Sequence, residues 1–186
     1  FLENRIVAIT GTNGKTTLTT LLGRIWNESG KKAVTAGNIG LPLCELIAKG
    51  LDPDALVFLE VSSFQAQELK NLCPSSVLWT NFEEDHLDHH ATMEEYFRSK
   101  ARLFSHEPGQ ESWIGRSVSE MAASLEYELP ENAKVAERDE MDSSFLPPDH
   151  FMNSYPQREN LSIAWKFCHS RGISKNEFER AILNYR

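Results

Sequence analysis

The stretch RIVAITGTNGKTTLTTLLGRIWNESG, residues 5–30, decides the fold of this chain. Residues 5–10 form a short apolar run that predicts a β-strand, and residues 15–30 predict a helix of about four turns that ends at Gly30. A glycine-rich turn joins them. A strand, a glycine turn and a helix in this order predict the opening of an α/β domain whose turn can bind phosphate.

The spacing of this turn departs from the common phosphate-binding loop. That loop has four residues between its first glycine and its Gly-Lys pair, whereas two residues separate Gly11 from Gly14. In such a site the backbone N–H groups and the positive helix end face the anion, Lys15 reaches the outer phosphates and the Thr16 hydroxyl can ligate Mg²⁺. An ordinary strand-to-helix turn is the alternative, but Gly-Lys-Thr at the helix start favours phosphate binding. The candidate phosphate site comprises Gly11, Thr12, Asn13, Gly14, Lys15, Thr16 and Thr17.

Strands and helices continue to alternate along the chain. Near-continuous apolar strands that alternate with helices are buried on both faces, so the sequence predicts a mainly parallel, doubly wound sheet in a three-layer α/β/α domain. Capping boxes are expected from Thr92 to Glu95 and from Ser174 to Glu177. The expected strands lie at residues 32–36, 55–61 and 75–81, and the expected helices at 41–50, 93–104, 157–170 and 175–185.

Residues 107–156 are less legible than the rest. They contain ESWIG at 111–115, a possible short helix near 118–125 and an acidic, proline-containing run at 127–149. We expect short strands and exposed loops here, with a small antiparallel β region within the domain.

Composition bounds the class of function. A chain of 186 residues suits a single domain. The net charge of −8, without a block of Lys or Arg, argues against a nucleic-acid or acidic-lipid surface, so small-molecule partners are expected. No apolar run approaches the ~20 residues of a membrane span. Because the chain begins at Phe1, we expect a domain cut from a longer protein.

Cysteine usage favours a reduced, cytoplasmic setting. The three cysteines are odd in number and form no C-x-x-C pair, which argues against a disulfide framework or a zinc ribbon. They are Cys44, Cys73 and Cys168.

Acidic and histidine side chains follow two of the predicted strands. Glu60 lies at the carboxyl end of the strand at 55–61, and open α/β sheets bind their ligands at this end of their strands. A solvated glutamate at a strand end is the alternative, but beside a phosphate loop we favour a role in binding Mg²⁺. After the strand at 75–81, five side chains could ligate a divalent metal or exchange protons, or belong to a solvated polar loop. They are Asp85, His86, Asp88, His89 and His90, of which one or two at most are expected to be functional.

Lys100 interrupts an apolar helix stripe. Met93, Tyr96, Phe97, Leu103 and Phe104 recur at helical spacing, and Lys100 occupies the missing position of that stripe. A lysine there either extends its ammonium to the helix edge or has an anion or a chemical modification as its reason. Its pKa could fall or rise, depending on whether burial or nearby carboxylates dominate.

Four motifs together resemble the ATP-dependent Mur ligases, which share the short loop with folylpolyglutamate synthases. They are TGTNGKTT, AGNIGLPL, LEVSSFQ and TNFEEDHLDHHATMEEYFRSKARLF, between Ile6 and Phe104. Within the family, GNIG with SSFQ is similar to the D-glutamate-adding branch; diaminopimelate- or lysine-adding relatives typically carry histidine where Phe64 stands.

The resemblance implies a reaction and its partners. ATP would phosphorylate the carboxylate of UDP-N-acetylmuramoyl-L-alanine, and D-glutamate would attack the acyl phosphate, in peptidoglycan precursor synthesis. It implies that residues 1–186 are the central ATP-binding domain, expected to be inactive without an N-terminal UDP-binding and a C-terminal amino-acid-binding domain, and that the protein is a monomer. The alternatives are another Mur ligase, a folylpolyglutamate synthase, or a non-catalytic ATP-binding switch.

The resemblance also implies residue roles. Lys15 would hold the γ-phosphate, Thr16 and Glu60 one Mg²⁺, and His86 a second Mg²⁺ together with a carbamate formed on Lys100 by CO₂. Asp85 would support His86, while Asn38 and Ser62 would contact the UDP-sugar peptide or the reacting phosphate. The family's adenine-site pattern is kept at Asn160 but has Glu159 and Ile163 at its other two positions, so adenine contacts are less secure than phosphate contacts.

Overall fold

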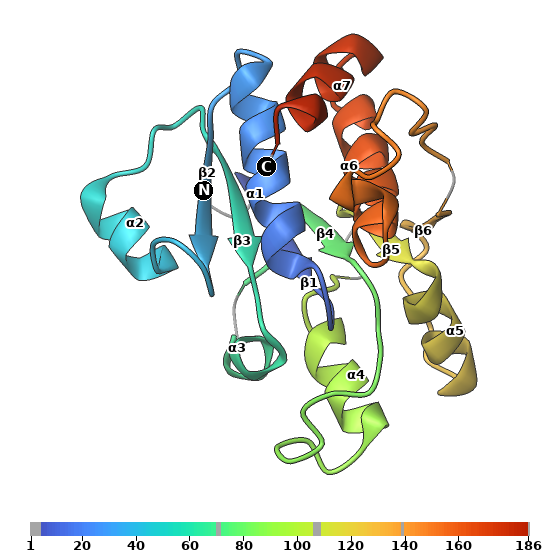
Figure 1. Cartoon of the computed structure of the whole chain (residues 1–186). Coiled ribbons are helices and arrows are strands. Elements are labelled where there is room, and N and C mark those ends of the chain that lie inside the picture. The colour runs from blue at the N-terminus through green and yellow to red at the C-terminus, as the bar shows by residue number, and fades with distance from the viewer. Residues whose placement is uncertain (1–4, 70–71, 106–108, 139, 186) are drawn as a thin grey trace.

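A computed structural model describes residues 5–69, 72–105, 109–138 and 140–185. Its sheet has the strand order β2-β3-β1-β4-β5-β6 (Figure 1), and every neighbouring pair is parallel. This confirms the predicted parallel sheet. The strands are β1 (Ile6–Thr10), β2 (Ala33–Gly37), β3 (Leu56–Glu60), β4 (Ser76–Trp79), β5 (Glu111–Gly115) and β6 (Ala133–Ala136).

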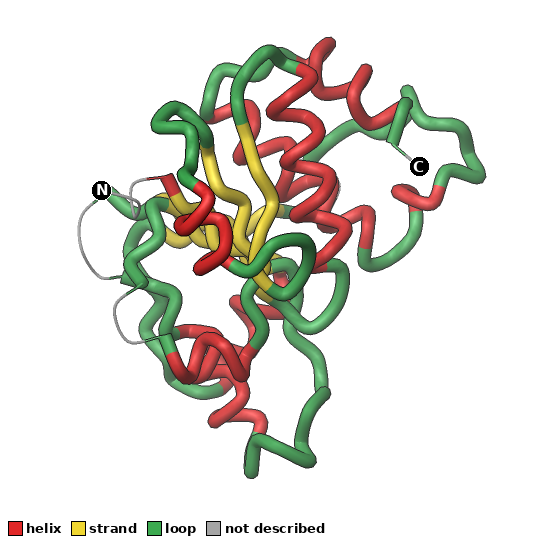
Figure 2. The backbone as a smooth tube through the Cα atoms, turned by 90° about the vertical axis from the view of Figure 1, so that its left-hand side faces the viewer, coloured by secondary structure: helices red, strands yellow, loops and turns green. Residues whose placement is uncertain are grey.

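Helices cover both faces of the sheet, as the three-layer prediction requires (Figure 2). One buried cluster joins the sheet to α1, α6 and α7, and a second joins the opposite face to α2, α3, α4 and α5. The helices are α1 (Lys15–Glu28), α2 (Leu43–Lys49), α3 (Ser63–Glu68), α4 (Met93–Ala101), α5 (Arg116–Ser124), α6 (Gln157–Ser170) and α7 (Lys175–Leu183), with the 3-10 helix η2 at Phe151–Asn153.

The alternation of side chains along β1 explains its continuous apolar sequence. Val7 and Ile9 pack in the cluster with α1, α6 and α7, whereas Ile6 and Ala8 pack in the opposite cluster. Successive side chains of a strand point to opposite faces, so a strand between two helix layers must be apolar at every position. β1 therefore lies at the centre of the domain.

The structure corrects the reading of residues 107–156. β5 and β6 are parallel to β4 and extend the main sheet, so the expected antiparallel region is wrong for the described residues. The reason is that α5 connects β5 to β6 and forms one more strand-helix-strand crossover, which brings the second strand back parallel to the first. The short helix expected near 118–125 is confirmed, although it begins at Arg116.

Two helix starts differ from expectation. Ser174 and Glu177 form the predicted capping box, but Thr92 forms half of one: its hydroxyl accepts from the Glu95 N–H, while the Glu95 carboxylate accepts from Ala91 N. Helix α3 was missed altogether. Its signal was the S-x-x-Q pattern after β3, a capping box that the structure shows complete.

The strand order places three chain segments at one edge of the sheet. β1 lies between β3 and β4, and all three are parallel, so their carboxyl ends meet at the same edge. The glycine turn follows β1, Glu60 is the last residue of β3, and residues 80–83 follow β4. This is the edge at which open α/β sheets bind ligands.

Candidate functional site

The glycine turn at the start of α1 has a conformation that requires its glycines. Gly11 has φ +147° and Gly14 has φ +77°. A Cβ on Gly11 would lie 1.9 Å from Thr80 Oγ1, and one on Gly14 would lie 2.3 Å from Asn160 Nδ2. Both backbone angle and space therefore exclude a side chain at these positions. The loop therefore packs closely against Thr80 at Gly11 and against Asn160 at Gly14.

The Lys15 side chain folds back over the turn. Its Nζ donates to the Gly11 carbonyl oxygen at 3.0 Å and to the Thr12 carbonyl oxygen at 2.8 Å. Burial lowers the pKa of Lys15, and the negative charges of Glu60 and Asp85 act in the opposite direction. The ammonium thus lies at the loop, within electrostatic reach of two carboxylates.

Glu60 connects the first turn of α1 to the end of β2. Its side chain is 2% exposed; Oε2 accepts from the Thr16 hydroxyl at 3.0 Å and Oε1 from Asn38 Nδ2 at 3.2 Å. The two predicted metal-ligating oxygens of Thr16 and Glu60 are therefore adjacent. Hydroxyl and carboxylate oxygens are the ligands that Mg²⁺ takes in phosphate sites, so these residues fit one such ion.

Lys100 is buried beneath the same loop. It is 1% exposed, its Nζ donates to the Gly11 carbonyl at 2.9 Å and lies 4.7 Å from the centre of the Tyr96 ring. Burial, reinforced by the positive charge of Lys15, lowers the pKa of Lys100 to about 7, against the opposing effect of Asp85. Between the two sequence alternatives, extension of the ammonium to the helix edge is therefore wrong. The amine lies in the core, and near pH 7 its neutral and charged forms are about equally populated.

The side chains of the histidine-rich segment after β4 contact different parts of the domain, and Asp85 and His86 form a close pair. Asp85 Oδ2 lies 3.4 Å from His86 Nε2, and Asp85 Oδ1 accepts from the His86 backbone N–H at 2.9 Å. His89 instead contacts Gln67, and His90 is buried against the Ser63 hydroxyl. Across the residues that the structure describes, no three His, Cys, Asp or Glu side chains gather closely enough to hold a metal.

His86 is held in an uncommon backbone conformation by its neighbours. Its φ is +53°, a value rare for a residue with a side chain. Its ring lies 5.0 Å from the Phe64 ring and 6.0 Å from the Tyr96 ring. Because Lys100 also contacts Tyr96, His86 and Lys100 flank the same aromatic ring. As an unmodified ammonium, however, Lys100 is a donor and not a metal ligand.

The remaining predicted residues have structural partners at this edge. Ser62 caps α3, with its hydroxyl accepting from Gln65 N at 3.2 Å. Asn160 Nδ2 donates to the Gly14 carbonyl at 3.0 Å, which places the first turn of α6 behind the phosphate loop. Ile163, one turn further along α6, is fully buried in the core. Burial raises the pKa of Glu159.

Two residues that sequence reasoning missed hold the loop most directly. Thr80 Oγ1 donates to the Asn13 carbonyl at 2.7 Å, and the Asn81 amide bonds both backbone groups of Asn13. The available signal was a Thr-Asn pair directly after β4, the strand that neighbours β1. Farther along, the Thr17 carbonyl accepts from the Tyr185 hydroxyl at 3.4 Å.

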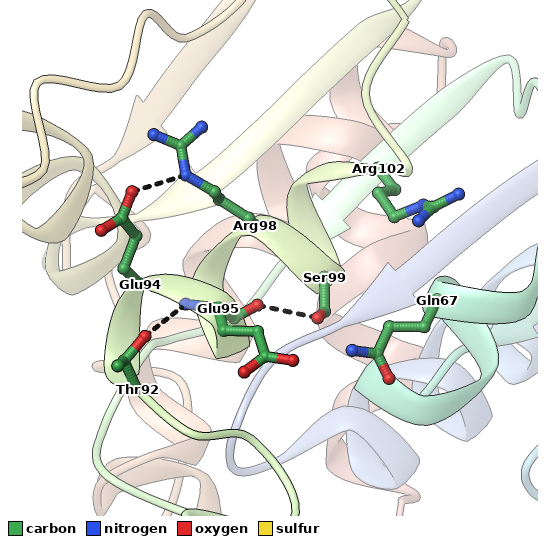
Figure 3. A pocket seen from close by; sticks show the side chains of 7 residues that line it. All are labelled: Gln67, Thr92, Glu94, Glu95, Arg98, Ser99 and Arg102. Atoms are coloured by element: carbon green, nitrogen blue, oxygen red, sulfur yellow. Dashed lines mark hydrogen bonds and ion pairs between the residues drawn. The ribbon is translucent and has the colours of Figure 1, made fainter.

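A separate polar cavity of about 440 Å³ lies between α3 and α4 (Figure 3). Several of its side chains already have partners: Arg98 pairs with Glu94, and the Thr92 and Ser99 hydroxyls bond the α4 backbone. Its lining includes none of the predicted phosphate-site residues. The phosphate loop is therefore the better candidate site.

Among the described residues, no helix combines the length and apolar character needed to cross a bilayer.

The fold and the loop define a three-layer α/β/α domain of the phosphate-loop class. The Mur ligase middle domain family matches residues 9–144, and the chain belongs to the Mur ligase family. This confirms the resemblance read from the four motifs.

Similar proteins carry the name of one branch. A UDP-N-acetylmuramoylalanine–D-glutamate ligase of Desulfovibrio desulfuricans is 34% identical over 187 residues, covering 100% of this chain and 41% of that protein. One of Desulfatibacillum aliphaticivorans is 46% identical over 109 residues, covering 59% of this chain and 24% of that protein. The chain thus spans less than half of the relatives it matches.

Solved structures share the fold. A UDP-N-acetylmuramoyl-L-alanyl-D-glutamate–2,6-diaminopimelate ligase superposes with a TM-score of 0.72 at 18% identity, covering 98% of this chain and 46% of the other. MurF from Acinetobacter baumannii superposes with a TM-score of 0.69 at 14% identity, covering 99% of this chain and 46% of the other. At such identities the likeness concerns the fold alone.

Proposed function

We propose that this chain is the central ATP-binding domain of a ligase that adds D-glutamate to UDP-N-acetylmuramoyl-L-alanine in peptidoglycan precursor synthesis. The observation that carries the proposal is the buried Glu60 carboxylate, bonded both to Thr16 in the phosphate helix and to Asn38. It joins the start of the phosphate helix to the GNIG turn at residues 37–40. The names of the similar proteins support the choice of D-glutamate.

The chemistry requires a phosphoryl group to move between anions. The γ-phosphate of ATP passes to the substrate carboxylate, which leaves ADP and an acyl phosphate; the amine of D-glutamate then attacks the acyl carbon, and inorganic phosphate leaves. In our proposal the residues Gly11 to Thr17 form the site for the ATP phosphates, which bind the backbone N–H groups at the start of α1 and its positive helix end. Lys15 leaves its loop carbonyls and neutralises the γ-phosphate.

Thr16 and Glu60 would hold one Mg²⁺. When bound, Mg²⁺ supplies positive charge that shields the phosphate oxygens from the incoming carboxylate. The residues themselves do the positioning: Glu60 is buried, its Oε1 is bonded to Asn38, and its Oε2 faces the Thr16 hydroxyl at the start of α1.

Lys100 and His86 would complete a second Mg²⁺ site. The neutral Lys100 amine would add to CO₂, forming a carbamate and releasing a proton. A pKa of about 7 makes the neutral amine abundant at neutral pH. The product is an anionic oxygen ligand, which explains a lysine on a buried apolar stripe, while Asp85 orients His86.

Substrate contacts and domain organisation belong to the same proposal. Asn38 and Ser62 would contact the UDP-sugar peptide or the reacting phosphate, and Asn160 the adenine. An N-terminal UDP-binding domain and a C-terminal domain for the amino acid would lie outside residues 1–186. We propose a cytoplasmic monomer that acts on small molecules, and we expect residues 1–186 alone to form little amide.

The test is phosphate release by the intact protein that contains this domain. ATP and UDP-N-acetylmuramoyl-L-alanine are supplied with D-glutamate, L-lysine, meso-diaminopimelate or L-glutamate, one at a time. Release with D-glutamate alone supports the proposal. The diamino acids are also tested with the dipeptide acceptor in place of UDP-N-acetylmuramoyl-L-alanine, and turnover with either of them would reassign the protein within its family. Turnover of folate with L-glutamate would move the protein to the folylpolyglutamate synthases.

Two lysine variants separate a ligase from an ATP-binding switch. Lys100→Ala should abolish phosphate release in the ligase but leave ATP binding by a switch untouched. Lys49→Ala, at an exposed position of α2, is the matched control and should retain full activity. Silence with every acceptor despite tight ATP binding would contradict the ligase assignment.

A further inference from the structure

The Asn81 side chain pairs with the backbone of the phosphate loop as a neighbouring strand would. Its Oδ1 accepts from the Asn13 N–H at 2.8 Å, and its Nδ2 donates to the Asn13 carbonyl at 3.0 Å. Its own carbonyl accepts from the Thr12 N–H at 3.1 Å. Thr80 adds a bond from its hydroxyl to the same Asn13 carbonyl. The apex of the loop is thus bonded to the segment that leaves β4.

These bonds divide the loop's N–H groups into two sets. The N–H groups of Thr12 and Asn13 point to Asn81 and are already used. The first helical bond of α1 runs from Leu18 N to the Gly14 carbonyl, so the N–H groups of residues 15–17 precede the ladder. Such groups lack an intrahelical partner at every helix start and are free to bind an anion.

The segment that carries Asn81 is itself rigid. Thr80 and Asn81 are both fully buried, and the Phe82 N–H donates to the Ser117 hydroxyl at 3.0 Å. A Cβ on Gly115 would lie 2.0 Å from the Thr80 carbonyl oxygen. The end of β5 therefore packs directly against this segment and leaves no space for it to move away from the loop.

We propose that Asn81 is a positioning residue that sets the phosphate loop in its binding conformation, leaving the N–H groups at the start of α1 for the ATP phosphates. The inference rests on the proposed binding of ATP. It accounts for the short loop: one N–H group is fixed by the Asn81 side chain and one by the Asn81 carbonyl, both from the segment that follows the neighbouring strand β4, so the loop needs fewer residues to curve around the anion. Asn81 itself contacts the loop and not the nucleotide.

The chain contains a matched control for this contact. The Asn27 amide bonds both backbone groups of Ala33 in the same pattern, accepting from N at 2.9 Å and donating to O at 3.2 Å. Asn27 lies near the opposite end of α1, away from the loop. Asn27→Ala therefore removes a comparable pair of bonds without touching the phosphate site.

The experiment measures the dissociation constants of ATP and AMP for the intact protein, by calorimetry, in wild type, Asn81→Ala, Thr80→Val and Asn27→Ala. Asn81→Ala should weaken ATP by about tenfold, the consequence of losing roughly one favourable hydrogen bond at the loop. Its effect on AMP, which lacks the outer phosphates, should be within twofold. Thr80→Val, which keeps the side-chain volume, should weaken ATP in the same direction by a smaller factor.

The outcomes separate this inference from the proposal beneath it. If wild type binds ATP and both loop variants bind it as tightly, or if ATP and AMP weaken equally, the positioning role is wrong while ATP binding stands. If wild type does not bind ATP, both fall together. Should Asn81→Ala fail to fold, Thr80→Val decides the question alone, with Asn27→Ala expected to match wild type.

Discussion

Replacing the buried Lys100 by methionine should remove a pH-dependent part of the stability of this domain. Methionine keeps an unbranched chain of similar length in the apolar stripe and removes the amine. The Gly11 carbonyl loses one bond from Lys100 but keeps its 3.0 Å bond from Lys15. The substitution therefore changes mainly the charge in the core, with little effect on hydrogen bonding.

The magnitude follows from the two pKa values. Folding lowers the pKa of Lys100 from 10.5 to about 7, chiefly because burial disfavours the charged form. Between these values the unfolded chain binds a proton that the folded chain lacks, so the free energy of unfolding rises with pH by ~1.4 kcal/mol per unit. Below about pH 7 both forms are protonated and the term is flat at its least favourable level. Between about pH 6 and pH 9 the gain sums to ~3 kcal/mol.

Urea unfolding at several pH values, followed by tryptophan fluorescence, measures this term. The buffers contain a chelator and are depleted of CO₂, so that neither a metal nor a carbamate contributes. The difference between wild type and Lys100→Met cancels the titrating groups that do not interact with Lys100. Lys49→Met, at an exposed position of α2, should follow the wild-type curve.

The expected result is that Lys100→Met is the more stable form near pH 6 and that its advantage shrinks by ~3 kcal/mol towards pH 9. Parallel curves for the two proteins between pH 6 and pH 9 would refute the reasoning, because they would show that folding does not lower the pKa of the Lys100 amine into this range. A gap that widens only above about pH 10 would show a pKa raised by Asp85, the opposite of the direction found here.

Three further changes test other parts of the site. Gly11→Ala should destabilise the domain by about 3 kcal/mol or prevent folding, because its Cβ would lie 1.9 Å from Thr80 Oγ1; thermal unfolding measures it, and a near wild-type melting temperature would contradict the loop geometry. Glu60→Gln keeps the side-chain shape, so it should leave stability within about 1 kcal/mol while weakening Mg²⁺-dependent ATP binding by at least roughly tenfold; titration of Mg²⁺ at fixed ATP shows whether the carboxylate charge matters. Ser62→Ala removes the cap of α3 and should cost about 1 kcal/mol in urea unfolding; no measurable loss, beside a loss from Ser174→Ala at the equivalent capping box of α7, would indicate that α3 needs no cap.

Much of the fold was predictable because its signals are local. The apolar runs of β1, β3 and β4 and the glycine turn read directly as a parallel α/β sheet, since buried parallel strands are apolar at every position. β6 was harder: its sequence AKVA is short and half-buried at the sheet edge. Edge strands bury one face less completely, so their pattern resembles that of a loop.

The site was predictable where one residue contradicted its own surroundings. Lys100 stood out because a charged side chain interrupted an apolar stripe, and the structure shows it buried. His90 carried no such contrast among neighbouring polar residues, yet it is fully buried against Ser63 and the Tyr96 ring. Polar segments without periodicity do not show which of their members fold inward.

The conformation of the phosphate loop could not be read from the loop itself. Residues 11–14 form hydrogen bonds with Thr80 and Asn81, almost seventy positions later in the sequence, and with Asn160, which is still later in the sequence. The sequence shows only a glycine spacing that is shorter than that of the common loop. The hydrogen bonds that hold the loop come from the segment after β4, which lies beside β1, and from α6, which packs against α1. A short loop is therefore not a weakened one: its length is set by how many of its backbone groups the neighbouring strand already holds.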